Sequence, residues 1–443
     1  MKLSLKTLIV FAFAGSACSV QAADLLQVYR DARSFDAQYA AARASRDAGL
    51  EKLPQGRAGL LPTIGLSSET KWNDIDYETL NKPPVKRAAE FNSNNWNVSL
   101  TQPLFRWQNW VGYQQAELAA TLAEVQFVLA GQDLMVRVTQ AYFDVLLAQE
   151  TLATAQAQKI AIAEQLESAK RNFEVGTATI TDTHEAQARF DLAFAQEIGA
   201  ENDLAVKRQI LLTLTGKEPE ALKGLKPRVL IGRPQPDEIS QWVTSAESGN
   251  LGVQLAQTSF EVASREIEKQ RAGHYPTLDL VASRGNTVIH SNIINATGGS
   301  DTNSNIIGLQ LAVPLFAGGS VMSKEREAVA LKEKARADLE NARRTATLGA
   351  RQAYLGVNAG LAQVKALEAG VASSQLAVES NKLGYEVGVR ININVLDAQS
   401  QLFDARQKLA KARLDTLIAQ LKLKSAAGSL SEDDLATINA LLE

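Results

Sequence analysis

Side chains that could perform catalysis or hold a metal ion are few and scattered in this 443-residue chain. His184, His274 and His290 lie far apart, and no His-x-x-x-His pair is present. There is also no phosphate-binding Gly-Lys-Ser/Thr loop and no Gly-x-Ser-x-Gly nucleophile motif. The charges of Lys324–Glu340 alternate in sign, which is typical of a solvated helix face. The sequence therefore predicts no enzyme activity, no cofactor and no metal site.

The overall composition excludes further classes of protein. The formal net charge is −3, which argues against a nucleic-acid-binding surface because such a surface needs a basic excess. A single cysteine excludes a disulfide framework and a cysteine-based zinc site. The length alone would suggest two or three compact domains.

The first residues have the pattern of a secretory signal peptide. Two lysines precede the apolar run Leu8–Ala14, and small residues follow as far as Ala22. We expect residues 1–22 to be removed on export; cleavage before Cys18 with lipid attachment is the alternative. The apolar run is too short to span a membrane, and no later segment is long and apolar enough to do so.

The rest of the chain is an internal twofold repeat. Short motifs of the first half return in the same order in the second, at separations of 211 to 214 residues. The clearest pairs are Arg57–Thr63 with Arg271–Thr277, Pro103-Leu104-Phe105 with Pro314-Leu315-Phe316, and Glu174-Val175-Gly176 with Glu386-Val387-Gly388. We therefore expect two copies of one unit, residues 23–216 and 238–428, joined by a linker at 217–237 and followed by a C-terminal segment at 429–443.

Each unit is predicted to contain a helix, two strands, a long helix, a tight turn and a second helix. The helix before the strands of the first unit is expected at about Leu25–Gly56. In the first unit we place strands at about 62–72 and 94–105, helices at about 104–174 and 181–215, and the turn at 175–180. In the second unit we place strands at about 276–288 and 305–316, helices at about 320–386 and 391–427, and the turn at 387–390.

Two kinds of periodicity support these elements. Val357, Val364, Val371, Val378 and Tyr385 are seven residues apart, with alanine and glutamine between them, as in slender helices packed in coiled-coil fashion. The strands, in contrast, alternate apolar with small polar residues, as in Trp96–Thr101. Such alternation fits a half-buried sheet or the wall of a membrane barrel.

The segments between the paired strands favour the barrel. Tyr77–Asn95 and Ile289–Asn305 are long, polar and rich in Asn, Ser and Asp, like the outer loops of an outer-membrane barrel. Four strands cannot close a barrel, because single-chain barrels start at eight and an open edge in lipid leaves backbone groups unpaired. The chain would therefore have to oligomerise, and two, three or four copies would give about 8, 12 or 16 strands.

The combination of these motifs resembles the TolC family of outer-membrane efflux ducts. The resemblance rests on the repeat, the Pro-Thr-x-x-Leu strand openings, the Pro-Leu-Phe strand ends, the Glu-Val-Gly turns and Leu-Lys-Ser-Ala-Ala-Gly near the C-terminus. It implies a mixed α/β membrane protein in which three chains form a 12-stranded outer-membrane β-barrel continued by an α-helical coiled-coil tunnel in the periplasm. The implied partners are two further copies of the chain, outer-membrane lipid, a periplasmic adaptor and an inner-membrane ABC or RND-type transporter that supplies the energy.

The resemblance also implies sites at the inner end of the tunnel. It places Asp182 opposite Tyr385 and Arg390 in a latch that holds the tip closed, a chemistry that suits reversible gating. Asp397 would form a ring of carboxylates that narrows the pore, while Asn394 stands where close relatives carry a second aspartate. We therefore expect weaker cation selectivity than in a relative with two acidic rings. The turns would dock the adaptor through Val175, Gly176 and Thr177 and through Val387, Gly388 and Val389.

Two other classes of exported protein remain alternatives. A periplasmic adaptor is also a coiled-coil hairpin protein, but the twofold repeat with paired strands disfavours it. A fibrous coiled-coil surface protein is disfavoured by the proline-bounded strands and the two matched turns. The identity of the cargo (drugs, metal ions or proteins) stays open.

Overall fold

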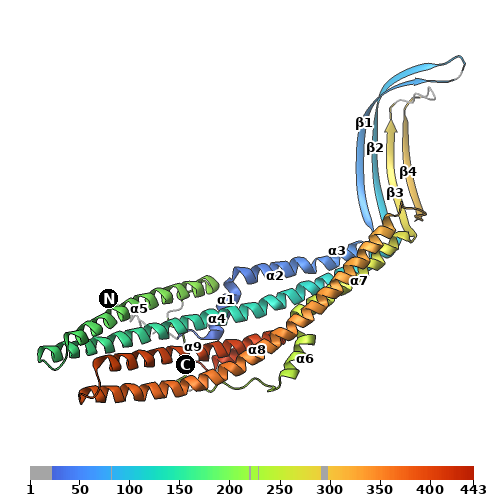
Figure 1. Cartoon of the computed structure of the whole chain (residues 1–443). Coiled ribbons are helices and arrows are strands. Elements are labelled where there is room, and N and C mark those ends of the chain that lie inside the picture. Colours follow the sequence, from blue (N-terminus) through green and yellow to red (C-terminus); the bar gives the residue numbers. More distant parts are fainter. Residues whose placement is uncertain (1–21, 81, 219–220, 228, 291–297) are drawn as a thin grey trace, which may run out of the picture.

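The computed structural model describes residues 22–80, 82–218, 221–227, 229–290 and 298–443. The molecule is elongated, with long helices at one end and a sheet at the other (Figure 1). The predicted signal peptide at 1–22 and Cys18 lie almost wholly outside the described residues. None of the helices in the described ranges is both long enough and apolar enough to cross a membrane.

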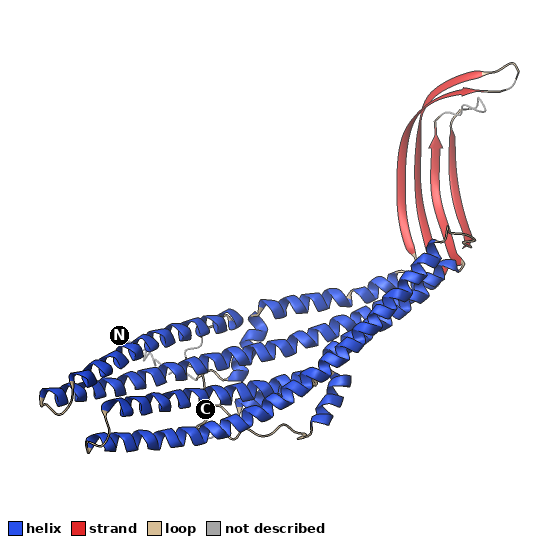
Figure 2. Ribbon diagram, viewed as in Figure 1, coloured by secondary structure: helices blue, strands red, loops and turns tan. Residues whose placement is uncertain are grey.

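Four antiparallel strands form one sheet in the order β1-β2-β3-β4 (Figure 2). They are β1 (Thr63–Glu78), β2 (Lys86–Phe105), β3 (Thr277–Ile289) and β4 (Ser300–Ala312). The strands extend beyond the predicted ones at their outer ends, because β1 and β2 continue into the expected loop and pair as far as Glu78 with Lys86. At its inner end β4 stops at Ala312, so Pro314-Leu315-Phe316, which was predicted as a strand end, follows the strand instead. Residues 77–95 are therefore largely strand. The second expected loop lies partly outside the described residues.

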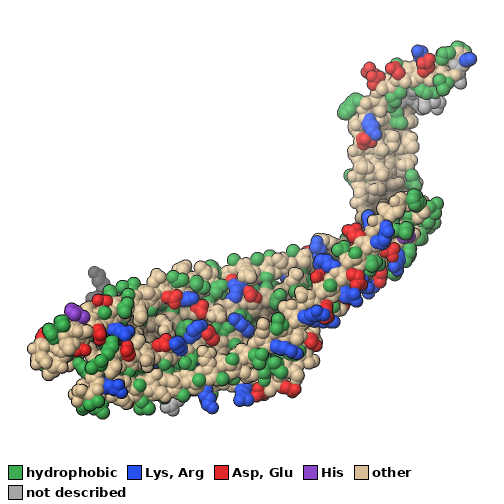
Figure 3. Space-filling model, in the orientation of Figure 1, with side chains coloured by type: hydrophobic (Ala, Val, Ile, Leu, Met, Phe, Trp, Pro, Cys, Tyr) green, Lys and Arg blue, Asp and Glu red, His purple; other side chains and the backbone are tan. Residues whose placement is uncertain are grey.

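The two faces of the sheet have different chemistry. Register places Ile64 opposite Leu100 and Leu66 opposite Val98 on one face, all four exposed or half-exposed. The alternate positions on the other face are small or polar, including Gly65, Ser67, Asn97 and Ser99. In Figure 3 the middle of the sheet shows few hydrophobic or charged side chains on the face in view. One face therefore suits lipid and the other suits water.

Two long helices run from the sheet to the far end of the molecule. Helix α4 (Trp107–Glu174) has 68 residues and α8 (Ser320–Glu386) has 67, so each rod is roughly 100 Å long. Each turns back into a helix of half that length, α5 (Ile180–Thr215) or α9 (Asn392–Ala426). Of the predicted heptad positions on α8, Val357, Val364 and Val378 are buried. Alanines such as Ala169, Ala186 and Ala193 fill the seam between α4 and α5, which lets the backbones approach closely.

The segment before the first strands is not the single helix that we expected at 25–56. It is divided into α1 (Leu25–Phe35), α2 (Ala37–Leu50) and α3 (Lys52–Ala58). The backbone of Asp36 leaves the helical region (φ −58°, ψ 119°), and its side chain accepts a hydrogen bond from the Tyr39 amide at 2.6 Å, so it begins a new helix. The second repeat bends likewise between α6 (Ile239–Gly249) and α7 (Leu251–Arg271), at Asn250.

The described part of the linker touches both ends of the described chain. Leu222 forms a parallel bridge with Ala23, and Leu225 an antiparallel bridge with Leu442, just after α10 (Glu432–Asn439). The fully buried Tyr142 of α4 donates its hydroxyl proton to the carbonyl of Lys223 at 2.7 Å. Leu222 and Leu225 of the linker pack against the largest apolar cluster among the described residues, which includes Tyr142 and Leu442.

A charged pair holds the junction between sheet and helices. Arg106, between β2 and α4, donates to both carboxylate oxygens of Asp279 on β3, at 2.8 and 2.5 Å. Asp279 is only 5% exposed. The fork of two parallel hydrogen bonds fixes the direction in which α4 leaves the sheet.

Candidate functional site

The two helical hairpins end side by side at the tip farthest from the sheet (Figure 1). Both turns reverse through a glycine in the left-handed region, Gly176 at φ 79° and Gly388 at φ 78°. In each turn the three backbone amides that follow the helix cap bond back to the last helical turn; for example, the Thr177 amide donates to the Asn172 carbonyl and the Val389 amide to the Gly384 carbonyl, both at 2.8 Å. This is a Schellman ending, which satisfies the last carbonyl groups of α4 and α8.

The predicted docking turns present apolar side chains to solvent. Val175, Val387 and Val389 are 72%, 64% and 78% exposed in the single chain. The Thr177 hydroxyl, in contrast, is used within the chain, where it donates to the Asn172 carbonyl at 3.0 Å. The tip is therefore a rigid turn with three exposed valines, a surface suited to contact with another protein.

Asp182, the first predicted latch residue, caps helix α5. Its Oδ2 atom accepts hydrogen bonds from the Thr179 amide at 2.9 Å and from the Thr179 hydroxyl at 2.8 Å. The Thr179 hydroxyl in turn accepts from the Asp182 amide, which completes a capping box. One carboxylate oxygen is occupied in this way, and within the described residues Oδ1 accepts no hydrogen bond.

The other two predicted latch residues do not meet Asp182 within one chain. The Tyr385 hydroxyl accepts a hydrogen bond from Asn172 Nδ2 at 2.9 Å, so it joins α8 to α4 instead. Arg390 is exposed, and its guanidinium forms no hydrogen bond or ion pair with any described residue. A latch made of these three side chains therefore requires a neighbouring chain.

The two residues predicted at the constriction differ in their surroundings. Asn394 is half-buried in the first turn of α9. Asp397, one turn further, forms an ion pair with Arg189 of α5 at 2.7 Å, and both side chains are about half exposed. The carboxylate of Asp397 is therefore not free in this conformation.

Sequence reasoning missed the polar residues that join the two hairpins. Asn172 reaches Tyr385, Arg189 reaches Asp397, and Gln165 donates to the buried Asn392. Gln165 and Asn172 are seven residues apart on α4, immediately before Leu166 and Phe173, two apolar residues with the same spacing. The heptad spacing of these polar residues beside apolar ones was the sequence signal that could have revealed the contacts between the hairpins.

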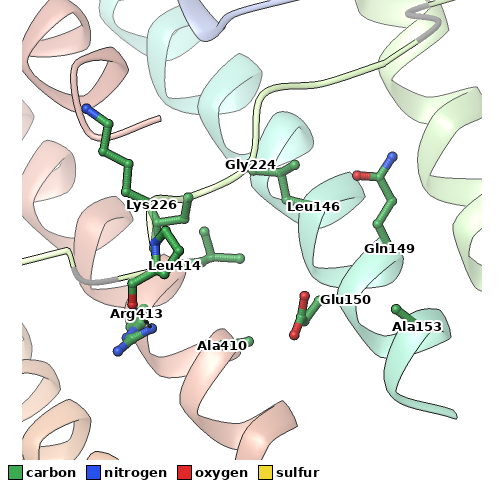
Figure 4. Close-up of a pocket in the computed structure, with 11 residues that line it drawn as sticks. Leu146, Gln149, Glu150, Ala153, Gly224, Lys226, Ala410, Arg413 and Leu414 are labelled. Atoms are coloured by element: carbon green, nitrogen blue, oxygen red, sulfur yellow. Dashed lines mark hydrogen bonds between the residues drawn. The ribbon is translucent and has the colours of Figure 1, made fainter. Parts of the chain in front are cut away.

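A groove of about 540 Å³ lies at the middle of the helices, between α4, α9 and the linker (Figure 4). Residues that line it include Leu146, Glu150 and Ala153 from α4, Gly224 and Lys226 from the linker, and Ala410, Arg413 and Leu414 from α9. Arg413 pairs with Glu368 of α8 at 2.7 Å. Across the described ranges no three His, Cys, Asp or Glu side chains are placed to hold a metal ion.

Comparison with known proteins identifies relatives over nearly the whole chain. The chain is 33% identical to the outer membrane protein TolC of Vibrio cholerae, over 96% of this chain and 95% of that protein. It is 34% identical to the alkaline protease secretion protein AprF of Pseudomonas aeruginosa, over 94% of this chain and 86% of that protein. Among solved structures, the CmeC outer membrane channel of Campylobacter jejuni has the same fold, with a TM-score of 0.78 at 16% identity, covering 94% of this chain and 89% of that one.

The match to a family model repeats the internal duplication. The model of the outer membrane efflux proteins matches residues 28–217 and again residues 242–429. These two ranges contain both hairpins, all four strands and every residue of the tip described above. The chain therefore belongs to the outer membrane efflux protein family, of which TolC is a member.

Proposed function

We propose that this chain is the passive outer-membrane exit duct of a tripartite efflux pump or a type I secretion system. One observation carries this function: an open four-stranded sheet continues directly into two helical hairpins roughly 100 Å long. Three chains together form a 12-stranded barrel in the outer membrane, and their hairpins form a tunnel that extends into the periplasm. The duct works with an adaptor and an inner-membrane transporter.

The two open edges of the sheet explain why the chain must assemble with further copies. The free edges of β1 and β4 would each leave unpaired N–H and C=O groups in lipid, and every such group costs several kcal/mol. Pairing of β4 with β1 of the next chain removes both edges. The relatives are channel proteins, and we infer that the transporter, rather than this chain, supplies the energy.

Membrane fractionation and cross-linking test this function. The protein should resist extraction by high salt and alkali, need detergent for release and migrate as a trimer. Release by salt or alkali would overturn the duct and favour a periplasmic adaptor or a surface fibre. Cross-linking in cells, followed by identification of the captured adaptor and transporter, would then distinguish efflux from secretion.

We propose that Asp182, Tyr385 and Arg390 latch neighbouring chains at the closed tip. The free guanidinium of Arg390 and the free Oδ1 of Asp182 support this arrangement, since each lacks a partner among the described residues of its own chain. Asp182→Ala and Arg390→Ser should each raise the single-channel conductance. Arg171→Ser, which removes a cation from the last turn of α4, is the control. Unchanged conductance in both latch variants would remove the assignment.

We also propose that the exposed valines of the two turns dock the adaptor. A cysteine at Val175 or Val389 should cross-link to the adaptor in cells, whereas one at the fully exposed Leu80, beyond β1, should not.

At the constriction, Asn394→Asp should strengthen block by multivalent cations. Equal block of that variant and the wild type would count against a pore-lining position for Asn394.

A further inference from the structure

The ion pair between Arg189 and Asp397 joins the two hairpins near the tip. Arg189 Nη2 lies 2.7 Å from Asp397 Oδ1, and the side chains are 41% and 49% exposed. Beneath the pair, the apolar side chains of Ala186, Ala193 and Leu396 are buried together. The two helices are therefore held in register by packing, and the charges meet at the edge of that packed seam.

Asp397 is the sole source of charge on its part of α9. From Asn392 to Phe403 no other residue is ionisable, and the next carboxylate is Asp404. On α5, Asp182 caps the helix and Asp191 accepts from Gln187 at 2.9 Å. Glu185 lies one turn before Arg189 but is exposed, and among the described residues the ion pair of Arg189 is with Asp397. Arg189 is thus placed to act on one anion.

The internal repeat does not dictate this pair. The position that corresponds to Arg189 in the second repeat is Gln401, and the position that corresponds to Asp397 in the first is Glu185. The cation is therefore specific to the first hairpin, whereas both hairpins carry a carboxylate at the position of Asp397.

We propose that Arg189 determines the ion selectivity of the duct by neutralising Asp397 at the constriction. This inference rests on the proposed function, in which three copies of Asp397 narrow the pore. With Arg189 in place, the closed tip presents three neutral pairs rather than three free carboxylates, which weakens its attraction for cations. When the hairpins move apart, the pair breaks and the carboxylates face the pore, so the open duct selects cations more strongly than the closed one.

Planar-bilayer recordings of purified trimers test the proposal through two readouts. The reversal potential in a KCl gradient reports selectivity, and the half-blocking concentration of La³⁺ reports the negative charge of the ring. Arg189→Gln should shift the reversal potential toward cation selectivity and lower the half-blocking concentration about fivefold, the scale of a half-exposed pair. Arg189→Lys should behave as the wild type.

A matched control separates this effect from a general loss of positive charge. Lys170 is 43% exposed and pairs with Glu167 on its own helix at 2.9 Å, so Lys170→Gln removes a similar charge near the tip without touching Asp397. It should leave both readouts unchanged. If Arg189→Gln changes conductance alone, the residue merely holds the hairpins together and the proposal is wrong.

The Asp397→Asn variant separates failure of the proposed constriction from failure of the proposed role of Arg189. If it leaves selectivity and block unchanged, Asp397 does not line the pore and the proposed constriction fails. If it changes them while Arg189→Gln does not, only the role of Arg189 fails. If Arg189→Gln does not assemble, the double variant that combines R189D with D397R takes its place. This variant keeps an ion pair at the same position and should retain the wild-type selectivity. A shift of its selectivity toward anions would overturn the proposal.

Discussion

The two repeats bend at the same place but hold the bend with different chemistry. In the first, Asp36 separates α1 from α2; in the second, Asn250 separates α6 from α7, with almost the same backbone angles (φ −62°, ψ 128°). Both side chains cap the following helix. Asp36, however, is charged and also binds Arg137, at 3.1 and 3.3 Å, whereas Asn250 is neutral and donates to the Ala426 carbonyl at 2.9 Å. The two repeats therefore share the backbone shape of the bend, but only the bend at Asp36 depends on an ionisable side chain.

The return helices pack against these bends through equivalent glycines. Gly216 (φ 69°) follows α5 and Gly428 (φ 74°) follows α9. A Cβ at Gly216 would lie 2.6 Å from the ring of Phe35, a side chain that is 57% exposed. A Cβ at Gly428 would lie 1.9 Å from the backbone oxygen of Gly249. An exposed ring can rotate and a packed backbone cannot, so the second junction is the more rigid.

The largest expected effect on stability comes from placing a side chain at the more rigid of the two junctions. Gly428→Ala combines a left-handed backbone with a collision against main chain, and it should lower stability by about 3 kcal/mol or more. Gly216→Ala should cost about 1 to 2 kcal/mol, because the main penalty is the backbone conformation. Thermal midpoints of the detergent-solubilised trimer, measured at one scan rate, compare the two. Equal losses would show that the two junctions are equally adaptable.

The second largest effect is expected from acid, which should weaken the bend at Asp36 but not the bend at Asn250. Burial alone would raise the pKa of Asp36, but hydrogen bonds from Arg137 and from the Tyr39 amide outweigh it and hold the pKa below its usual value. A carboxyl whose folded pKa is lowered stabilises the protein above the unfolded value, and this contribution disappears as the pH falls through the folded value.

Wild-type stability should therefore decrease below about pH 4 by about 1 to 2 kcal/mol through this group. Asp36→Asn, which copies the second repeat, should be less stable at neutral pH and lose less on acidification. Asn250→Asp supplies the reciprocal test. Parallel acid curves for the wild type and Asp36→Asn would contradict the assignment.

A glycine-to-alanine substitution should lower stability equally at the two tip turns. A Cβ at Gly176 or at Gly388 would meet no atom within 4 Å, so only the left-handed backbone is penalised. Gly176→Ala and Gly388→Ala should each cost about 1 kcal/mol. A clear inequality in the thermal midpoints would mean that the turns differ in the assembled tip, for example through contact with a neighbouring chain.

The smallest effect is expected at the starts of the return helices. Helix α5 begins with the Thr179 capping box, whereas α9 begins after Ile391, whose side chain cannot cap. Thr179→Ala should destabilise the first turn of α5 by about 1 kcal/mol, and Ile391→Thr should stabilise that of α9 by a similar or smaller amount. Hydrogen exchange of the first-turn amides measures both.

The Thr179 variant also separates two roles of Asp182. If Asp182→Ala raises conductance only because α5 frays, Thr179→Ala should raise it equally. If the carboxylate holds the latch, Thr179→Ala should have the weaker effect in bilayer recordings.

The periodic features of the molecule were predictable because they repeat. Valines seven residues apart indicated the packed helices, alternation indicated the strands, and paired motifs indicated the duplication. The bend at Asp36 was missed because the surrounding alanine-rich sequence continues the helical pattern on both sides. The outer ends of β1 and β2 were missed because their exposed polar residues look like loop until their pairing is known.

The polar contacts of the tip were not predictable, for a different reason. Asn172 with Tyr385 and Arg189 with Asp397 are separated by more than 200 residues in sequence. Whether two such side chains meet depends on the relative rotation of two hairpins, which apolar periodicity alone does not determine. Asp182 was predicted as a latch residue, and its use as a helix cap became visible only once the turn geometry was known.

The Arg106–Asp279 pair gives the assembled duct an uneven mechanical character. It lies between β2 and β3, and therefore inside a chain. Where β4 meets β1 of the next chain, the corresponding repeat positions are Ala317 and Gly65, which cannot form such a bond. Around the ring, three joints that carry this pair thus alternate with three joints that lack it. We expect torsion applied to the tunnel to be taken up between chains rather than within a chain, so that each chain moves as one unit.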